Sequence, residues 1–262
     1  MKRRNFVKSS LLLPALPAMI TSNPSDMPKK KKQEWYEWRV YTLKNETQQK
    51  LVEDYFEQAL IPAMNRQGSK NIGLFKELKP EAQTRLFAII PYTEINSYLE
   101  AESKLAKDTS YQTAAAPYLT APSTSPAYDR IQSSLLKAFD GMPVMEVPEK
   151  KDRIFELRRY ESASESAGKK KIEMFNQAGE IAIFRRVGLT PVFFGEAVIG
   201  EMRPNLTYML TFDDMPEHDK NWKSFGSDPD WKKISSMPEY ADSKIVSRIT
   251  RTFLAPCAAS QV

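Results

Sequence analysis

One short pattern in this chain brings together side chains that could bind an anion. The pattern Glu-x-Arg-x-Tyr occurs in EWYEWRVYTL, at residues 34–43, and returns 119 residues later in RIFELRRYES. A guanidinium forms charge-assisted hydrogen bonds with carboxylates and oxyanions, and a tyrosine hydroxyl can orient such a ligand. The candidate ligand-binding residues are therefore Glu37, Arg39, Tyr41, Glu156, Arg158 and Tyr160.

The segment that carries the first triplet has the alternation of a β-strand. Side chains of a strand point alternately to its two faces, so the triplet shares one face while Trp38 and Val40 share the other. If Trp38 and Val40 pack on helices, the triplet faces the interior of the fold. There, each glutamate is expected to neutralise an arginine. Two readings stay open: a buried ion-pair network that fixes how two halves dock, and a cavity in which the arginines bind an anionic ligand.

The elements that position the first triplet follow in the order β-α-β-β-α-β. Apolar residues recur at helical spacing in TQQKLVEDYFEQALIPAMNRQG, which ends at Gly68. Two strands, NIGLFKEL and RLFAIIPY, come next, followed by a helix in TEINSYLEAESKLAKD and a last strand at residues 131–139.

The same order returns from residue 153, which indicates an internal duplication. Gly68 and Gly188, at the ends of two predicted helices, differ by 120 positions. The strands FAIIPYT and YMLTFDD align at an offset of 121, and Tyr111 aligns with Trp231 at 120. Residues 144–151 are the predicted linker.

Each half is expected to be a ferredoxin-like unit whose antiparallel sheet is covered by helices on one face only. The predicted fold class is therefore α+β, with two tandem repeats packed sheet to sheet as a pseudo-twofold α+β barrel. The expected organisation is a signal peptide and linker at 1–33, repeat 1 at 34–147 with an insertion at 111–128, and repeat 2 with a C-terminal tail at 148–262. Both a monomer that contains the whole barrel and a homodimer are compatible with it.

The chain resembles the NIPSNAP family in both halves. YEWRVYTL and FELRRYES are similar to that family's opening Y-E-L-R-x-Y-x-L, and TYMLTFDDMPEHDKNWKSFGSDPDWKKI is similar to its passage through an Asp-Asp helix cap to D-P-x-W. The first half departs from this pattern, since it has Asp108-Thr109-Ser110-Tyr111 in place of D-P-x-W. The resemblance implies a dimeric α+β barrel and no agreed catalytic set, so catalytic residues are not assigned.

The N-terminus predicts export. KRRNFVKSSLLLPALPAMI has a charged start and a short apolar run, and Arg3-Arg4-Asn5-Phe6-Val7-Lys8 is similar to a twin-arginine signal. Such a signal implies transport of a folded protein to the periplasm, with no stable membrane span after its removal. The segment also supplies most of the net charge of +5. The remainder therefore has no concentrated basic face, and no nucleic-acid partner is expected.

Metal and cofactor chemistry is not expected. One histidine and one cysteine exclude the usual Cys/His zinc sites. His218 is interpreted as a packing or capping residue, with a base or haem ligand as the alternative. Asp213 and Asp214 are interpreted as a helix cap completed by Glu217 rather than as metal ligands. The Lys169–Lys171 run is expected at a solvated surface.

Three functions remain: a small-molecule-binding protein of the periplasm, an oxygenase-like enzyme on the same fold, and a noncatalytic structural or interaction protein. A cavity of several hundred Å³ in the barrel would favour the first two, and a filled interior the third. The identity of any ligand is not encoded in a recognisable motif.

Overall fold

The computed structural model describes residues 32–80 and 83–262. The predicted twin-arginine segment lies outside the described residues, so export stays a prediction. No helix in the described part of the chain is long and apolar enough to cross a membrane.

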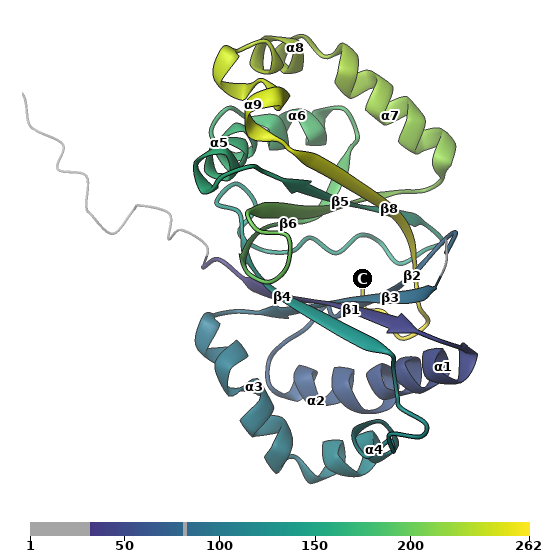
Figure 1. Ribbon diagram of the computed structural model, residues 1–262. Helices are drawn as coiled ribbons and strands as arrows, with labels where there is room; N and C mark the ends of the chain where they lie inside the picture. The colour runs from purple at the N-terminus through teal and green to yellow at the C-terminus, as the bar shows by residue number, and fades with distance from the viewer. Residues whose placement is uncertain (1–31, 81–82) are drawn as a thin grey trace, which may run out of the picture. The chain divides into compact units, whose positions relative to one another are not determined.

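The first repeat has the predicted element order (Figure 1). Asn45 caps the first helix by accepting a hydrogen bond from the backbone N–H of Gln48, and a turn of π-helix joins this helix to the next. Gly68 follows the helical segment with φ of +94°, a left-handed conformation that favours glycine. The elements are β1 (Trp35–Leu43), α1 (Glu46–Tyr55), the π-helix (Phe56–Leu60), α2 (Ile61–Arg66), β2 (Gly73–Glu77), β3 (Thr84–Tyr92), α3 (Ile95–Lys107), α4 (Thr109–Leu119) and β4 (Arg130–Ala138).

The second repeat follows the same plan with more, shorter helices. Asp214 caps α7, and Glu217 accepts a hydrogen bond of 2.6 Å from the backbone N–H of Asp213, so the predicted cap is confirmed. The elements are β5 (Ile154–Glu161), α5 (Glu165–Asn176), α6 (Glu180–Arg186), β6 (Thr190–Ile199), β7 (Asn205–Phe212), α7 (Met215–Ser227), α8 (Pro229–Ser235), a 3₁₀ turn (Pro238–Tyr240), α9 (Asp242–Ile245) and β8 (Arg248–Pro256).

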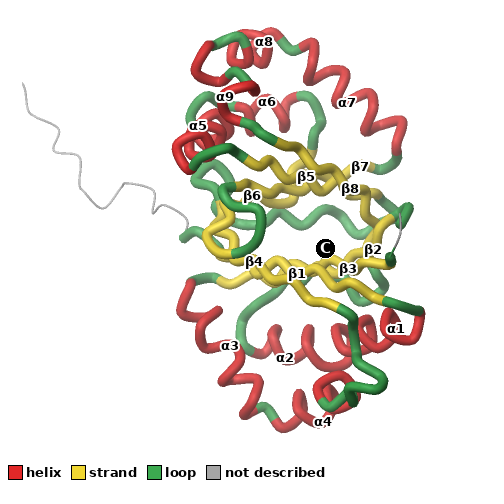
Figure 2. Tube along the Cα trace, in the orientation of Figure 1, coloured by secondary structure: helices red, strands yellow, loops and turns green. Residues whose placement is uncertain are grey.

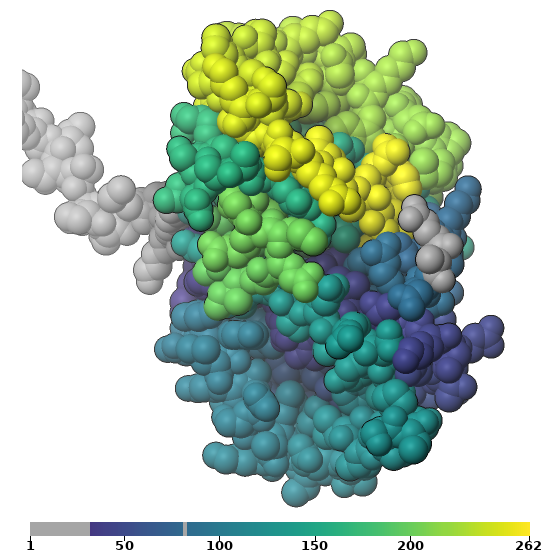
Figure 3. All heavy atoms as spheres, viewed as in Figure 1, coloured from purple at the N-terminus to yellow at the C-terminus, as the bar shows by residue number. Residues whose placement is uncertain are grey.

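The strands of both repeats form one closed barrel in the order β1-β3-β2-β8-β5-β7-β6-β4. Within each repeat the order is that of a ferredoxin-like sheet, and all pairs are antiparallel. Two seams join the repeats: β2 pairs with β8, and β4 pairs with β6. Figure 3 shows β8 crossing one face of the molecule toward the first repeat. The predicted fold class is thus confirmed, with edge hydrogen bonds as well as sheet packing.

Strand pairing corrects one predicted offset between the repeats. Trp38 is paired with Ile89, and the equivalent Leu157 is paired with Met209, so β3 and β7 align at 120 rather than 121. A slip of one residue matters because it exchanges the two faces of a strand. The predicted offset was wrong because apolar residues occupy both faces of these strands.

The region expected as an insertion at 111–128 contains most of α4 and adds little length. The offset is 120 at the helix caps Asp108 and Asp228 and 118 at the strand starts Arg130 and Arg248. The first repeat is therefore only two residues longer here, because the second repeat fills the same span with α8, the 3₁₀ turn and α9.

Apolar side chains form three cores. Figure 2 shows the helices on the outer sides of the two sheets. One core lies between the first sheet and α1 to α4, and another between the second sheet and its helices. The third fills part of the barrel interior, where Tyr36, Phe75, Phe155 and Phe193 are fully buried. The helices thus cover the outer faces of the barrel, and the inner faces meet each other.

Candidate functional site

The first triplet forms a buried ion pair beneath the helices of its own repeat. Arg39 donates to Glu37 through Nε at 2.6 Å and through Nη2 at 2.9 Å. The hydroxyl of Tyr92 donates to the same carboxylate at 3.2 Å. Tyr41 packs edge-on against Phe56, a residue of the π-helix. These contacts tie β1 to β3 and to the helical layer.

The second triplet is more deeply buried and has more partners. Glu156 has no exposed side-chain surface and accepts from Arg158 at 3.0 Å and from the Trp222 indole at 2.7 Å. His218 places Nε2 3.3 Å from the same carboxylate. Although burial disfavours a charged guanidinium, neighbouring tyrosine and glutamate oxygens hold the pKa of Arg158 above its ordinary value.

Both triplets face the helices, so the expectation that they face the barrel interior was wrong. Trp38, Val40 and Leu157 point into the barrel instead. The alternation was predicted correctly, but the assignment of faces was inverted. The physical reason is that the helices supply the polar partners, Trp222 and His218, which a carboxylate needs in order to be buried.

The structure therefore brings each glutamate to its arginine but does not bring the two triplets together. The tyrosines also remain in separate repeats: Tyr160 shares a hydrogen bond of 3.1 Å with Tyr208, and Tyr118 donates to Tyr41 at 3.4 Å. The six residues do not line one common cavity, and their contacts anchor helices to sheets within each repeat.

His218 is a packing residue with a polar contact, in line with its primary interpretation. Its ring packs edge-on against Phe212 and Phe253, with ring centroids 4.9 and 5.1 Å away. Its Nδ1 lies 2.8 Å from Asp219 Oδ1. Among the described residues, no group of three or more His, Cys, Asp or Glu side chains is arranged to hold a metal ion.

Repeat 2 has a further buried ion pair, which lies in its helical layer. Lys171 places Nζ 3.3 Å from Glu180 Oε2, and both side chains are 3% exposed. The expectation of a solvated lysine run was wrong for Lys171, whose ammonium lies 4.9 Å from the centre of the Phe175 ring. Burial raises the pKa of Glu180, and the nearby Lys171 opposes that rise.

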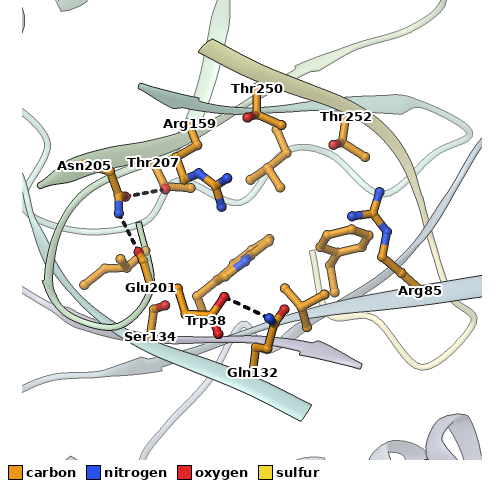
Figure 4. A pocket seen from close by; sticks show the side chains of 14 residues that line it. Trp38, Arg85, Gln132, Ser134, Arg159, Glu201, Asn205, Thr207, Thr250 and Thr252 are labelled. Carbon is orange, nitrogen blue, oxygen red and sulfur yellow. Dashed lines mark hydrogen bonds between the residues drawn. The ribbon is translucent and has the colours of Figure 1, made fainter. Parts of the chain in front are cut away.

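The barrel interior is packed at one end and hollow at the other. At the packed end, Tyr36 meets Phe193 and Phe75 meets Phe155, with ring centroids 5.4 and 5.0 Å apart. At the hollow end a cavity of about 140 Å³ remains between the repeats (Figure 4). Its lining residues are Trp38, Val40, Arg85, Phe87, Gln132, Ser134, Leu136, Leu157, Arg159, Glu201, Asn205, Thr207, Thr250 and Thr252.

The polar lining of this cavity is organised by hydrogen bonds. Gln132 donates to Glu201 at 2.8 Å and so joins β4 of repeat 1 to the β6–β7 loop of repeat 2. Asn205 donates to two backbone carbonyls of that loop and accepts from Thr207. The hydroxyl oxygen of Thr250 is buried and has no hydrogen-bond partner within the described residues. Thr250 itself is one of the residues that line the cavity.

One sequence pattern indicates this cavity, although the Glu-x-Arg-x-Tyr triplets were chosen as the candidate site instead. The last strand of each repeat, β4 and β8, carries polar residues at alternate positions: Gln132 and Ser134 in the first, Thr250 and Thr252 in the second. Such residues on the inner face of a barrel indicate a wet interior. In repeat 2 the arginine of β5 that lines the cavity is Arg159, the neighbour of the triplet residue Arg158.

The fold and this hollow barrel define an α+β-barrel protein with two ferredoxin-like halves. The profile of the NIPSNAP family matches residues 36–139 and 155–261, one match to each half. The chain belongs to the NIPSNAP family, as the resemblance of its strand motifs predicted.

Solved structures share the whole fold at low sequence identity. Proteins from Fusobacterium nucleatum and Lactobacillus acidophilus, both described provisionally as monooxygenases, are 10% and 9% identical, each with a TM-score of 0.56. The alignments cover 86% of this chain and 92% and 94% of those chains. A NIPSNAP family protein from Agrobacterium tumefaciens is 16% identical, with a TM-score of 0.36 over 41% of this chain and 96% of its own. The comparison with curated proteins gave no match.

Proposed function

We propose that this protein binds a small molecule in the cavity at the hollow end of its barrel. The observation that carries the proposal is a cavity between the two repeats that has an apolar floor and a polar wall. Binding sites combine apolar surface with a few placed polar groups, and this cavity has that composition. Its volume of about 140 Å³ is smaller than the several hundred Å³ expected of a binding barrel, and it limits the ligand to about one ring.

Of the three possible functions, this cavity favours a small-molecule-binding protein. An enzyme of the oxygenase kind would be favoured by an acid and a base within hydrogen-bond reach inside the cavity. Glu201 is the acidic residue among the lining side chains, and its partner there is the amide of Gln132. His218 contacts Glu156 on the outer, helix-covered face of the sheet instead. The likeness to proteins described provisionally as monooxygenases concerns the fold alone.

We also propose that the protein acts after export to the periplasm. The support is the Arg3-Arg4 motif ahead of the leucine run. An exported protein that binds a small molecule would meet its ligand outside the cytoplasm.

Native mass spectrometry of the protein isolated from its own compartment tests the binding proposal. We expect a retained small molecule in the wild type. Thr252 lines the cavity, so Thr252→Phe should fill the space and lose this molecule, whereas Thr252→Val, of similar size, should keep it. Circular dichroism of both variants checks that the barrel still folds. An empty wild-type protein, or a mass retained equally by Thr252→Phe, would contradict the proposal.

A further inference from the structure

Two arginines from different repeats line the cavity, and each pairs with a glutamate that is not among the lining residues. Arg159 on β5 donates to Glu161 through Nε at 3.1 Å and pairs with it through Nη2 at 2.9 Å. Arg85 on β3 donates to Glu77 through Nε at 3.1 Å and also through Nη2. Within the described part of the chain, these glutamates are the hydrogen-bond partners of the two guanidinium groups.

This arrangement leaves the remaining N–H groups of both arginines for the cavity. A guanidinium has five N–H donors in a planar fork, and a carboxylate behind it occupies only the Nε and Nη2 side. The glutamate holds the fork in place, and neither Glu161 nor Glu77 is among the residues that line the cavity. Arg85 and Arg159 thus form two oriented donor groups at the cavity (Figure 4).

The rest of the lining sets the shape of what these donors can bind. Trp38 and Phe87 lie on the apolar side, with ring centroids 6.1 Å apart, and Leu157 adds to the same surface. Flat apolar groups pack well against such rings. Glu201 is the one acidic side chain in the lining, and its carboxylate already accepts a hydrogen bond from Gln132. The lining therefore carries two positively charged side chains and one carboxylate, which already accepts a hydrogen bond.

We infer that the cavity takes a small organic monoanion with a flat apolar body, such as a one-ring carboxylate. Its body lies against Trp38 and Phe87, and its anionic group accepts hydrogen bonds from Arg159 and Arg85. The volume of about 140 Å³ is close to that of cavities that hold a benzene ring. This inference rests on the proposed function, because it names the ligand class of the same cavity.

Calorimetric titration with two probes of the same shape tests the charge requirement. Benzoate carries the anionic group, and benzamide is its neutral counterpart. We expect benzoate to bind wild-type protein at least tenfold more tightly than benzamide, because only the anion gains charge-assisted hydrogen bonds. Thr252→Phe should abolish the binding of both probes if they occupy the cavity.

Variants of the two arginines test whether they bind the anionic group of benzoate. Arg159→Gln should weaken benzoate binding by about tenfold to a hundredfold and leave benzamide unchanged, and Arg85→Gln should act in the same direction. Arg185→Gln is the matched control, since Arg185 also pairs with a glutamate, Glu146, but at the surface of α6. Arg159→Lys, which keeps the charge and loses the fork, should retain part of the affinity and guards against misfolding of the Gln variant.

The outcomes separate this inference from the proposed function. Equal binding of benzoate and benzamide, or benzoate binding that Arg159→Gln and Arg85→Gln do not weaken, overturns the anion assignment. The anion assignment is also overturned if wild-type protein binds neither probe, while mass spectrometry finds a retained molecule that is lost in Thr252→Phe. In each of these cases the cavity still binds a ligand. Failure of the proposed function is the different result in which mass spectrometry finds no molecule that depends on the cavity.

Discussion

The indole N–H of Trp222 donates a hydrogen bond of 2.7 Å to Glu156, a carboxylate with no exposed surface. The tryptophan lies on α7 and the glutamate on β5, so the bond ties a helix to the sheet beneath it. In the first repeat the position equivalent to Trp222 is the exposed Glu102, and Glu37 accepts from Tyr92 instead. The same motif therefore has different surroundings in the two repeats.

This difference predicts unequal costs when the arginines are neutralised. Arg158→Gln removes the nearer of the two arginines that pair with the buried Glu156, the other being Arg251 at 4.0 Å, and it should cost about 3–5 kcal/mol in the free energy of unfolding. Arg39→Gln should cost less, because the side chain of Glu37 is 10% exposed and can be partly hydrated. Urea unfolding of the two single variants measures these costs. The double variant Arg158→Gln with Glu156→Gln removes both charges, so it should recover much of the stability that Arg158→Gln loses. A change in benzoate affinity in these variants would mean that the triplets do reach the ligand.

The glycines that follow α2 in repeat 1 and α6 in repeat 2 form a matched pair. Gly68 and Gly188 have φ of +94° and +84°, so alanine at either position should cost about 1–2 kcal/mol through backbone strain. At Gly188 an added Cβ would also come within 2.9 Å of Asn221 Nδ2, which donates to the Gly188 carbonyl. At Gly68 nothing lies within 4 Å. Gly188→Ala should therefore cost about 1 kcal/mol more than Gly68→Ala in thermal or urea unfolding. Equal costs would show that Asn221 adapts freely.

Glu180 predicts a pH dependence of stability with a definite sign. Its folded-state pKa is raised above the ordinary value of 4.5 by burial, so the folded state binds the proton more tightly than the unfolded state. Its contribution to stability is then largest below pH 4.5 and falls as the pH rises through the raised pKa. The unfolding free energy of Glu180→Gln minus that of wild type should therefore increase from pH 4 to pH 7. The exposed Glu165→Gln, in the adjacent helix α5, is the control. A flat or falling difference for Glu180→Gln would contradict the assignment.

Export is tested on the twin-arginine pair itself. Replacing Arg3 and Arg4 by lysine keeps the charge but should leave precursor in the cytoplasm, because the transport route reads the arginine pair. Lys2→Arg keeps the pair and is the control. Cell fractionation with immunoblotting measures the distribution. Unchanged recovery from the periplasm would refute this route.

The fold could be predicted from the sequence because its signals repeat. The strand motifs at Glu37 and Glu156 and the helix-ending glycines Gly68 and Gly188 recur at nearly constant spacing, and each repeat alone leaves one sheet face uncovered. Those two facts require the halves to meet. The edge pairing of β2 with β8 and of β4 with β6 did not follow, because it depends on sheet curvature and not on local pattern.

The site was harder to predict because burial alone does not identify a face. Alternation on β1 separates Arg39 from Trp38, but both faces of this strand are covered, one by helices and one by the opposite sheet. The choice between them depends on partners such as Trp222, which lies 66 positions from Glu156 in the chain. The cavity arises from packing that fills one end of the barrel only. A sequence without aligned relatives carries that information weakly, in the alternate threonines of β8.

The joining of both repeats in one chain allows the two walls of the cavity to differ. Two identical subunits would present every side chain twice, so a ligand on their axis would meet the same groups on either side. Here Val40 of β1 corresponds to Arg159 of β5, and Phe87 of β3 corresponds to Thr207 of β7. The wall from repeat 1 is therefore apolar at these positions, and the wall from repeat 2 offers hydrogen-bonding groups. A ligand with two unlike ends can therefore be held in a single direction, which a symmetric pair of subunits could not enforce.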